Sequence, residues 1–170
     1  MNQRRKTPAS VMALGGVMAA LAVVIMSLGG LIPVATYVSP MLCAVLLQLV
    51  LNACGKRIAW AWYGAVALLS VLLSPDKEAA AVFVFLGYYP IVKPGLDRAK
   101  PSWLWKGLLF NGSVGVMYFL LLELFGMAEL GEDFTEFGMV MLLVLLAMGN
   151  LTFFLLDRLL GMRKLQRKVF

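Results

Sequence analysis

The chain contains no histidine, only two cysteines and few charged residues, and each shortage excludes a class of chemistry. Histidine is the usual proton relay and a common ligand of zinc and haem, so its absence disfavours metal, haem and Ser–His or Cys–His chemistry. Cys43 and Cys54 lie in one apolar segment, about 16 Å apart if that segment is a helix, which is too far for a disulfide. We therefore expect no metal, no cofactor and no disulfide.

Enzyme motifs are missing as well. The sequence has no HExxH, no glycine-rich phosphate loop and no GxSxG. Its nine acidic residues lie mainly between apolar stretches, and their spacing establishes no catalytic pair. We predict that the protein is not an enzyme.

The chain is instead rich in long apolar stretches. Hydrophobic residues make up 62% of it, charged residues 14%, and the mean hydropathy is +0.89. These values predict an all-α polytopic membrane protein, folded as one compact six-helix bundle over residues 1–170. The expected helices cover about 10–36, 40–54, 57–74, 78–92, 103–127 and 137–160, of which the second and fourth are short for a full span.

Basic residues fall in alternate gaps between these stretches. The clusters are Arg4, Arg5 and Lys6; Lys56 and Arg57; Lys93, Arg98, Lys100 and Lys106; and Arg158, Arg163, Lys164, Arg167 and Lys168. Among the lysines and arginines, only Lys77 falls in the intervening set. Because Lys and Arg are retained on the cytoplasmic face, this pattern predicts that both termini are cytoplasmic and the acidic turns face outward. It also explains the net charge of +6 without nucleic-acid binding, which we do not expect.

Small residues crowd the first apolar stretch, with pairs at spacings of four. They are Ala9, Ala13, Gly15, Gly16, Ala19 and Ala20. Small side chains let another helix approach closely, which is how helices associate in lipid. The spacing fits packing within this bundle and docking of an external partner equally well.

The outer end of that stretch is broken by glycine and proline between Gly29 and Pro40. Such a break predicts either a short outer loop that dips into a cavity or an ordinary kinked helix end. Glu123 lies among Leu and Phe, where a carboxylate exposed to lipid is costly, so it needs a cavity, a cation or a partner. Lys77 is one possible partner; alternatively, both charges are solvated at loops.

Amides and hydroxyls occur inside the apolar stretches. They are Gln48, Asn52, Asn111, Ser113, Asn150 and Thr152. Such groups commonly hydrogen-bond between membrane helices, for about 0.6 kcal/mol each. We interpret them as contacts that hold the bundle together.

In topology, small-residue first helix and broken outer connection, the chain resembles the substrate-binding S-components of energy-coupling factor (ECF) transporters. Ala9 and Ala13 match the Ala-x-x-x-Ala motif with which that family packs against its T-component, whereas Gly16 and Ala20 differ from it by one residue type. The resemblance implies capture of a vitamin or other micronutrient in an outward cavity of a bacterial plasma-membrane protein. It also implies partnership with a T-component and two cytoplasmic ATPases, and places Thr36, Tyr37, Glu78 and Glu123 near the cavity.

Two other functions remain open. One is a membrane scaffold of the bacterial cell envelope, such as the rod-shape-determining protein, which has similar length and helix count. The other is a stand-alone transporter or channel, although more intramembrane charge or repeated broken helices would be expected there.

Overall fold

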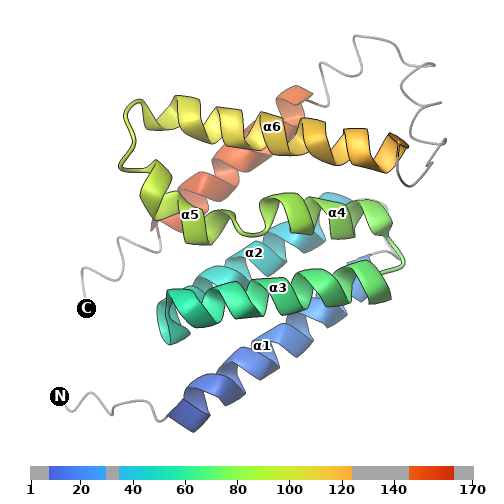
Figure 1. Ribbon diagram of the computed structural model, residues 1–170, viewed down its shortest axis with the longest axis vertical. Coiled ribbons are helices and arrows are strands. Elements are labelled where there is room, and N and C mark those ends of the chain that lie inside the picture. The colour runs from blue at the N-terminus through green and yellow to red at the C-terminus, as the bar shows by residue number, and fades with distance from the viewer. Residues whose placement is uncertain (1–7, 30–34, 124–145, 163–170) are drawn as a thin grey trace. The chain divides into compact units, whose positions relative to one another are not determined.

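The computed structural model describes residues 8–29, 35–123 and 146–162, and within these ranges the chain is helical and contains no strand (Figure 1). This confirms the all-α class. The helices are α1 (Pro8–Gly29), α2 (Ala35–Cys54), α3 (Lys56–Leu73), α4 (Lys77–Leu86), α5 (Tyr89–Leu96) and α6 (Ser102–Glu123), and residues 146–162 are also helical.

Four stretches are long and apolar enough to cross a membrane. They are Met12–Gly29, Thr36–Cys54, Lys56–Leu73 and Lys77–Leu96. At about 1.5 Å per residue, stretches of this length match a hydrocarbon core roughly 30 Å thick. The fold is therefore that of a helical membrane protein. The predicted spans 103–127 and 137–160 overlap α6 and residues 146–162 but extend outside the described residues, so they stay predictions.

The junction between the first two helices differs from the sequence prediction. α1 ends at Gly29, not near residue 36, and α2 already begins at Ala35. The expected break therefore does not reach Pro40, which lies inside α2. Proline removes only one backbone donor near the start of a helix, whereas an open loop in an apolar setting would leave several groups without partners. With these residues included, α2 is 20 residues long and no longer short for a span.

The predicted helix 78–92 is also longer, and it is interrupted. It consists of α4 and α5, separated by a turn at Gly87 and Tyr88. A Cβ at Gly87 would lie 2.6 Å and 2.7 Å from ring atoms of Phe83, so the buried Phe83 ring requires glycine there. Together the two helices supply the 20-residue stretch Lys77–Leu96.

Close contacts group the chain into two units, residues 1–95 and 96–170. In the first unit, α2 packs against α1, α3 and α4, and α3 packs against α1 and α4 (Figure 1). The expectation of one domain over residues 1–170 stays a prediction.

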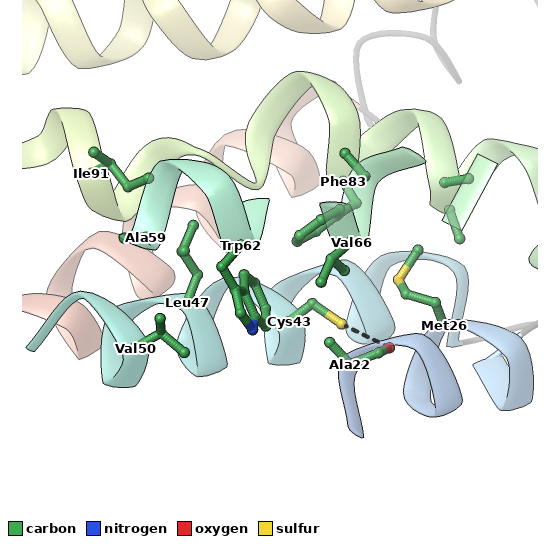
Figure 2. Packing of buried hydrophobic residues seen from close by; sticks show 13 residues of the cluster. Ala22, Met26, Cys43, Leu47, Val50, Ala59, Trp62, Val66, Phe83 and Ile91 are labelled. Carbon is green, nitrogen blue, oxygen red and sulfur yellow. Dashed lines mark hydrogen bonds between the residues drawn. The ribbon is translucent and has the colours of Figure 1, made fainter. Parts of the chain in front are cut away.

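The first unit is centred on Trp62 of α3 (Figure 2). Its indole N–H donates to the carbonyl oxygen of Gly15 at 3.1 Å, and the Cys43 thiol donates to that of Ala22 at 3.5 Å. Both bonds attach α1 to its neighbours. Leu47, Val66 and Phe83 fill the surrounding space and are fully buried, so the helices are held by close packing rather than by expulsion of water.

In the second unit, α6 packs on residues 146–162 through an aromatic pair and an amide pair. Phe110 stacks on Phe153 with ring centroids 4.8 Å apart. Asn111 and Asn150 exchange side-chain hydrogen bonds of 3.2 Å and 3.0 Å, which confirms for these two amides the predicted link between helices. A Cβ at Gly149 would lie 3.2 Å from the Phe110 ring, so glycine permits this close approach.

Two other polar side chains, those of Gln48 and Thr152, donate within their own helices. The Gln48 amide donates to Asn52 one turn later in α2, at 3.0 Å, and the Thr152 hydroxyl donates to the carbonyl of Met148 in its own helix. Both are local bonds at a spacing of four residues, where side chains on a helix are neighbours. Both cysteines are free thiols.

Candidate functional site

Four helix termini of the first unit meet at one end. The Ser74 hydroxyl, just after α3, lies 3.2 Å from the carbonyl oxygen of Met26 in α1 and 3.0 Å from that of Asp76. Because Ser74 is buried, these contacts fix the end of α1 against the turn between α3 and α4. The Thr36 side chain attaches the start of α2 to the same turn.

Asp76 occupies the centre of this end. One carboxylate oxygen accepts the backbone N–H of Ala79 at 2.9 Å and thereby caps the N-terminus of α4. The other accepts the Thr36 hydroxyl of α2 at 2.7 Å. Asp76 is half-buried and makes specific bonds. It is therefore more than a solvated loop charge.

A second bond of the same kind lies beside it. The Tyr37 hydroxyl donates to Glu78 at 2.8 Å, so two successive residues of α2 contact two carboxylates at the start of α4. We call Thr36, Tyr37, Ser74, Asp76 and Glu78 the α2–α4 polar cluster. It brings together three of the four residues predicted to line a ligand cavity. The fourth, Glu123, ends α6, and its side chain lies outside the described residues.

The Lys77 ammonium group binds backbone carbonyls rather than the carboxylates of this cluster. Its Nζ donates to the carbonyl oxygens of Val71 at 2.9 Å and Ser74 at 3.0 Å, at the C-terminal end of α3. Lysine there is favourable because the last carbonyls of a helix lack partners and carry partial negative charge. In this part of the described chain, hydroxyls and carboxylates therefore dominate the chemistry.

The sequence analysis did not single out Ser74 or Asp76 as site residues. The signal was present, since Asp76 directly precedes an apolar helical stretch with Glu78 in its first turn, which is the pattern of a helix N-cap. Among the described residues, no group of three or more metal-ligating side chains occurs. The cluster can accept and donate hydrogen bonds and attract positive charge.

The structure also divides the small residues of α1 between two faces. Gly15 is buried where Trp62 bonds to it, and Ala19 is half-buried against the core. The other four form an exposed face: Ala9, Ala13, Gly16 and Ala20. A Cβ would meet nothing within 4 Å at either Gly15 or Gly16, so it is exposure that distinguishes the two faces. We call the exposed one the α1 small-residue face.

Charge is segregated along the first unit. Lys56 and Arg57 are exposed at the turn between α2 and α3, the opposite end of α3 from the α2–α4 polar cluster. Trp60 and Tyr63 lie one to two turns into α3 from the basic turn. Trp60 stacks on Tyr88 of the α4–α5 turn, with centroids 6.3 Å apart. Trp60, Tyr63 and Tyr88 thus gather at the basic end of α3.

Comparison with models of known protein families, with curated proteins and with solved structures finds no match. The fold defines the class, a helical membrane protein. Two features of the first unit bear on its function, the α2–α4 polar cluster and the α1 small-residue face.

Proposed function

We propose that this chain is the substrate-capture subunit of an ECF-type micronutrient transporter of the bacterial plasma membrane, multi-pass with both termini cytoplasmic. A small molecule binds near the α2–α4 polar cluster on the outer side, and energy comes from a T-component and two cytoplasmic ATPases. The chain contains no phosphate-binding loop, so active uptake requires such partners.

The observation that carries this proposal is the division of α1 into two faces. One face is used inside the first unit, through Gly15 bonded to Trp62 and Ala22 bonded to Cys43. The other presents Ala13, Gly16 and Ala20, which are exposed in the described part of the chain. A flat, exposed strip of this kind allows close approach of a partner helix in lipid, where association depends on contact between backbones.

The α2–α4 polar cluster supports a ligand that is apolar or positively charged rather than phosphorylated. Lys77 is the one cation that the described residues place at this end, and its ammonium group caps α3. Phosphate recognition usually requires free Arg or Lys donors. Asp76 and Glu78 instead offer negative charge close to the hydroxyls of Thr36 and Tyr37.

Docking is tested by placing tryptophan on the α1 small-residue face. We expect Ala13→Trp, Gly16→Trp and Ala20→Trp each to reduce co-purification of the T-component and ATPases about tenfold or more, because bulk prevents close helix approach. Leu68→Trp is the matched control, since Leu68 is a 63% exposed apolar residue of α3. Unchanged assembly in all three α1 variants would refute this docking face.

Ligand capture is tested separately by thermal unfolding of the purified protein against a panel of vitamins and metabolites. A ligand that binds the folded state at 100 times its Kd adds about 2.7 kcal/mol of stability, so one member should raise the Tm clearly. Thr36→Val and Glu78→Gln should abolish that rise, whereas Leu68→Trp should keep it. No rise with any compound would favour the scaffold of the cell envelope. Binding without assembly would favour a stand-alone transporter.

A further inference from the structure

The basic turn between α2 and α3 has no role in the proposed function. α2 ends at Cys54 and α3 begins at Lys56, so Gly55 alone separates two helices that can each cross a membrane. The turn therefore lies where a membrane span begins, at the level of the lipid headgroups. We therefore expect the side chains of this turn to interact with lipid headgroups.

Two cations at this turn have no carboxylate partner among the described residues. Lys56 and Arg57 are both exposed, and within the described ranges neither makes an ion pair or a side-chain hydrogen bond. The first turn of α3 contains no acidic residue. In the second unit, by contrast, Lys106 is paired with Asp97 at 2.6 Å and Asp157 at 3.0 Å. The positive charge at Lys56 and Arg57 is therefore available to an outside anion.

An aromatic group lies beside these cations and is already fixed in position. Trp60 follows Lys56 by four residues and Arg57 by three, so all three share one face of α3. Its ring stacks on Tyr88 and meets the edge of Tyr63 at 5.9 Å, and the Tyr63 hydroxyl donates to the Val84 carbonyl. Trp60 nevertheless stays 42% exposed, and its indole N–H has no partner among the described residues.

We infer that Lys56, Arg57 and Trp60 form a binding site for the headgroup of an anionic phospholipid. The phosphate and any further negative charge would meet the two cations, as basic residues next to a span attract anionic lipid. The indole would lie at the boundary between headgroup and acyl chain, where Trp is favoured, with its N–H toward the lipid ester oxygens. This inference depends on the membrane-spanning fold and is independent of the proposed transport role.

The dependence of the Tm on lipid composition tests this headgroup site. In nanodiscs of phosphatidylcholine, adding about one third phosphatidylglycerol should raise the Tm of the full chain by about 5 °C, the scale expected for two interfacial cations. The double variant K56Q/R57Q should keep its Tm in phosphatidylcholine and lose more than half of the rise. The charge-conserving K56R/R57K should retain the rise, as should R158Q, which removes an exposed cation elsewhere.

Two further measurements distinguish binding of a lipid headgroup from binding of a free anion and from misfolding of the double variant. Inorganic phosphate added to phosphatidylcholine nanodiscs should leave the Tm unchanged, because a free anion lacks the acyl chains that hold the headgroup at this depth. An equal rise with phosphate would overturn the assignment to lipid. If the double variant does not fold, W60F and the single variants K56Q and R57Q are measured instead, and a full phosphatidylglycerol rise in all three would refute the site.

Discussion

Several side chains that join helices in this protein bond to backbone oxygens of a neighbouring helix. Trp62 donates to Gly15, Cys43 to Ala22, and Ser74 lies within bonding distance of Met26. A helical carbonyl has two lone pairs and can accept such a bond without leaving its own helix. The donor residue is visible in the sequence, but the carbonyl that receives it is not, because every residue offers one.

At the residue scale, we predict the contribution of the Trp62 indole N–H. Trp62→Phe keeps an aromatic ring and should lower the free energy of unfolding by about 0.5–1.5 kcal/mol, measured by thermal or denaturant unfolding in detergent. Trp62→Ala should cost about 3–5 kcal/mol, because it also leaves a cavity. Trp60→Phe is the control, since its N–H has no partner in the described part of the chain. Equal losses for both Phe variants would show that the bond to Gly15 adds nothing.

At the scale of elements, the turns decide where spans begin and end. The two helices α2 and α3 are separated by Gly55 alone, whose φ of 88° and ψ of 170° are accessible essentially to glycine only. At the other end of α3 the chain reverses through Ser74 and the N-cap Asp76. Both reversals depend on local residue types, and both separate stretches that are apolar enough to be spans.

Substitution of Gly55 tests this reasoning. Gly55→Ala should destabilise the protein by about 1–3 kcal/mol, although a Cβ there has open space, because the cost comes from the backbone conformation. Gly64→Ala is the matched control within α3, where a Cβ also meets nothing, and it should stabilise by up to about 1 kcal/mol. The comparison uses thermal unfolding of both variants. A neutral Gly55→Ala would contradict the strained turn.

At the scale of the whole molecule, the segregation of charge is the feature that sets orientation. In the first unit, the exposed cations Lys56 and Arg57 and the carboxylates Asp76 and Glu78 lie at opposite ends of α3. Because positive residues are retained inside during insertion, we predict that the α2–α4 polar cluster faces outward. The proposed capture of an external ligand requires this orientation.

Cysteine labelling in intact cells measures that orientation. In a Cys43→Ala, Cys54→Ser background, Pro75→Cys should react with a membrane-impermeant maleimide, whereas Lys100→Cys should react only after permeabilisation. Pro75 and Lys100 are both exposed, so a cysteine at either position is accessible to the reagent. The reverse pattern would place the α2–α4 polar cluster inside the cell and exclude external capture, and equal labelling at both positions would contradict the alternation of spans.

The sequence alone was sufficient for the class of fold and for the position of α3, although the N-cap role of Asp76 was not recognised in it. These depend on local chemistry: apolar length, a glycine at a tight turn and the separation of cations from acids. The start of α2 could not be predicted in the same way. Glycine and proline suggested a loop as far as Pro40, but satisfying backbone groups in an apolar setting extends the helix to Ala35.

Only the tertiary structure decided which residues meet. Thr36 and Asp76 are forty residues apart in the chain and become partners because α2 and α4 pack with their N-termini at the same end. Likewise, α1 is apolar around its circumference, so no periodicity distinguishes the face with Gly15 from the face with Gly16. The face with Gly15 is buried because Trp62 packs against it and donates to its carbonyl oxygen. Such a contact depends on the shapes of side chains that lie far apart in the sequence, which a pattern of residue types does not contain.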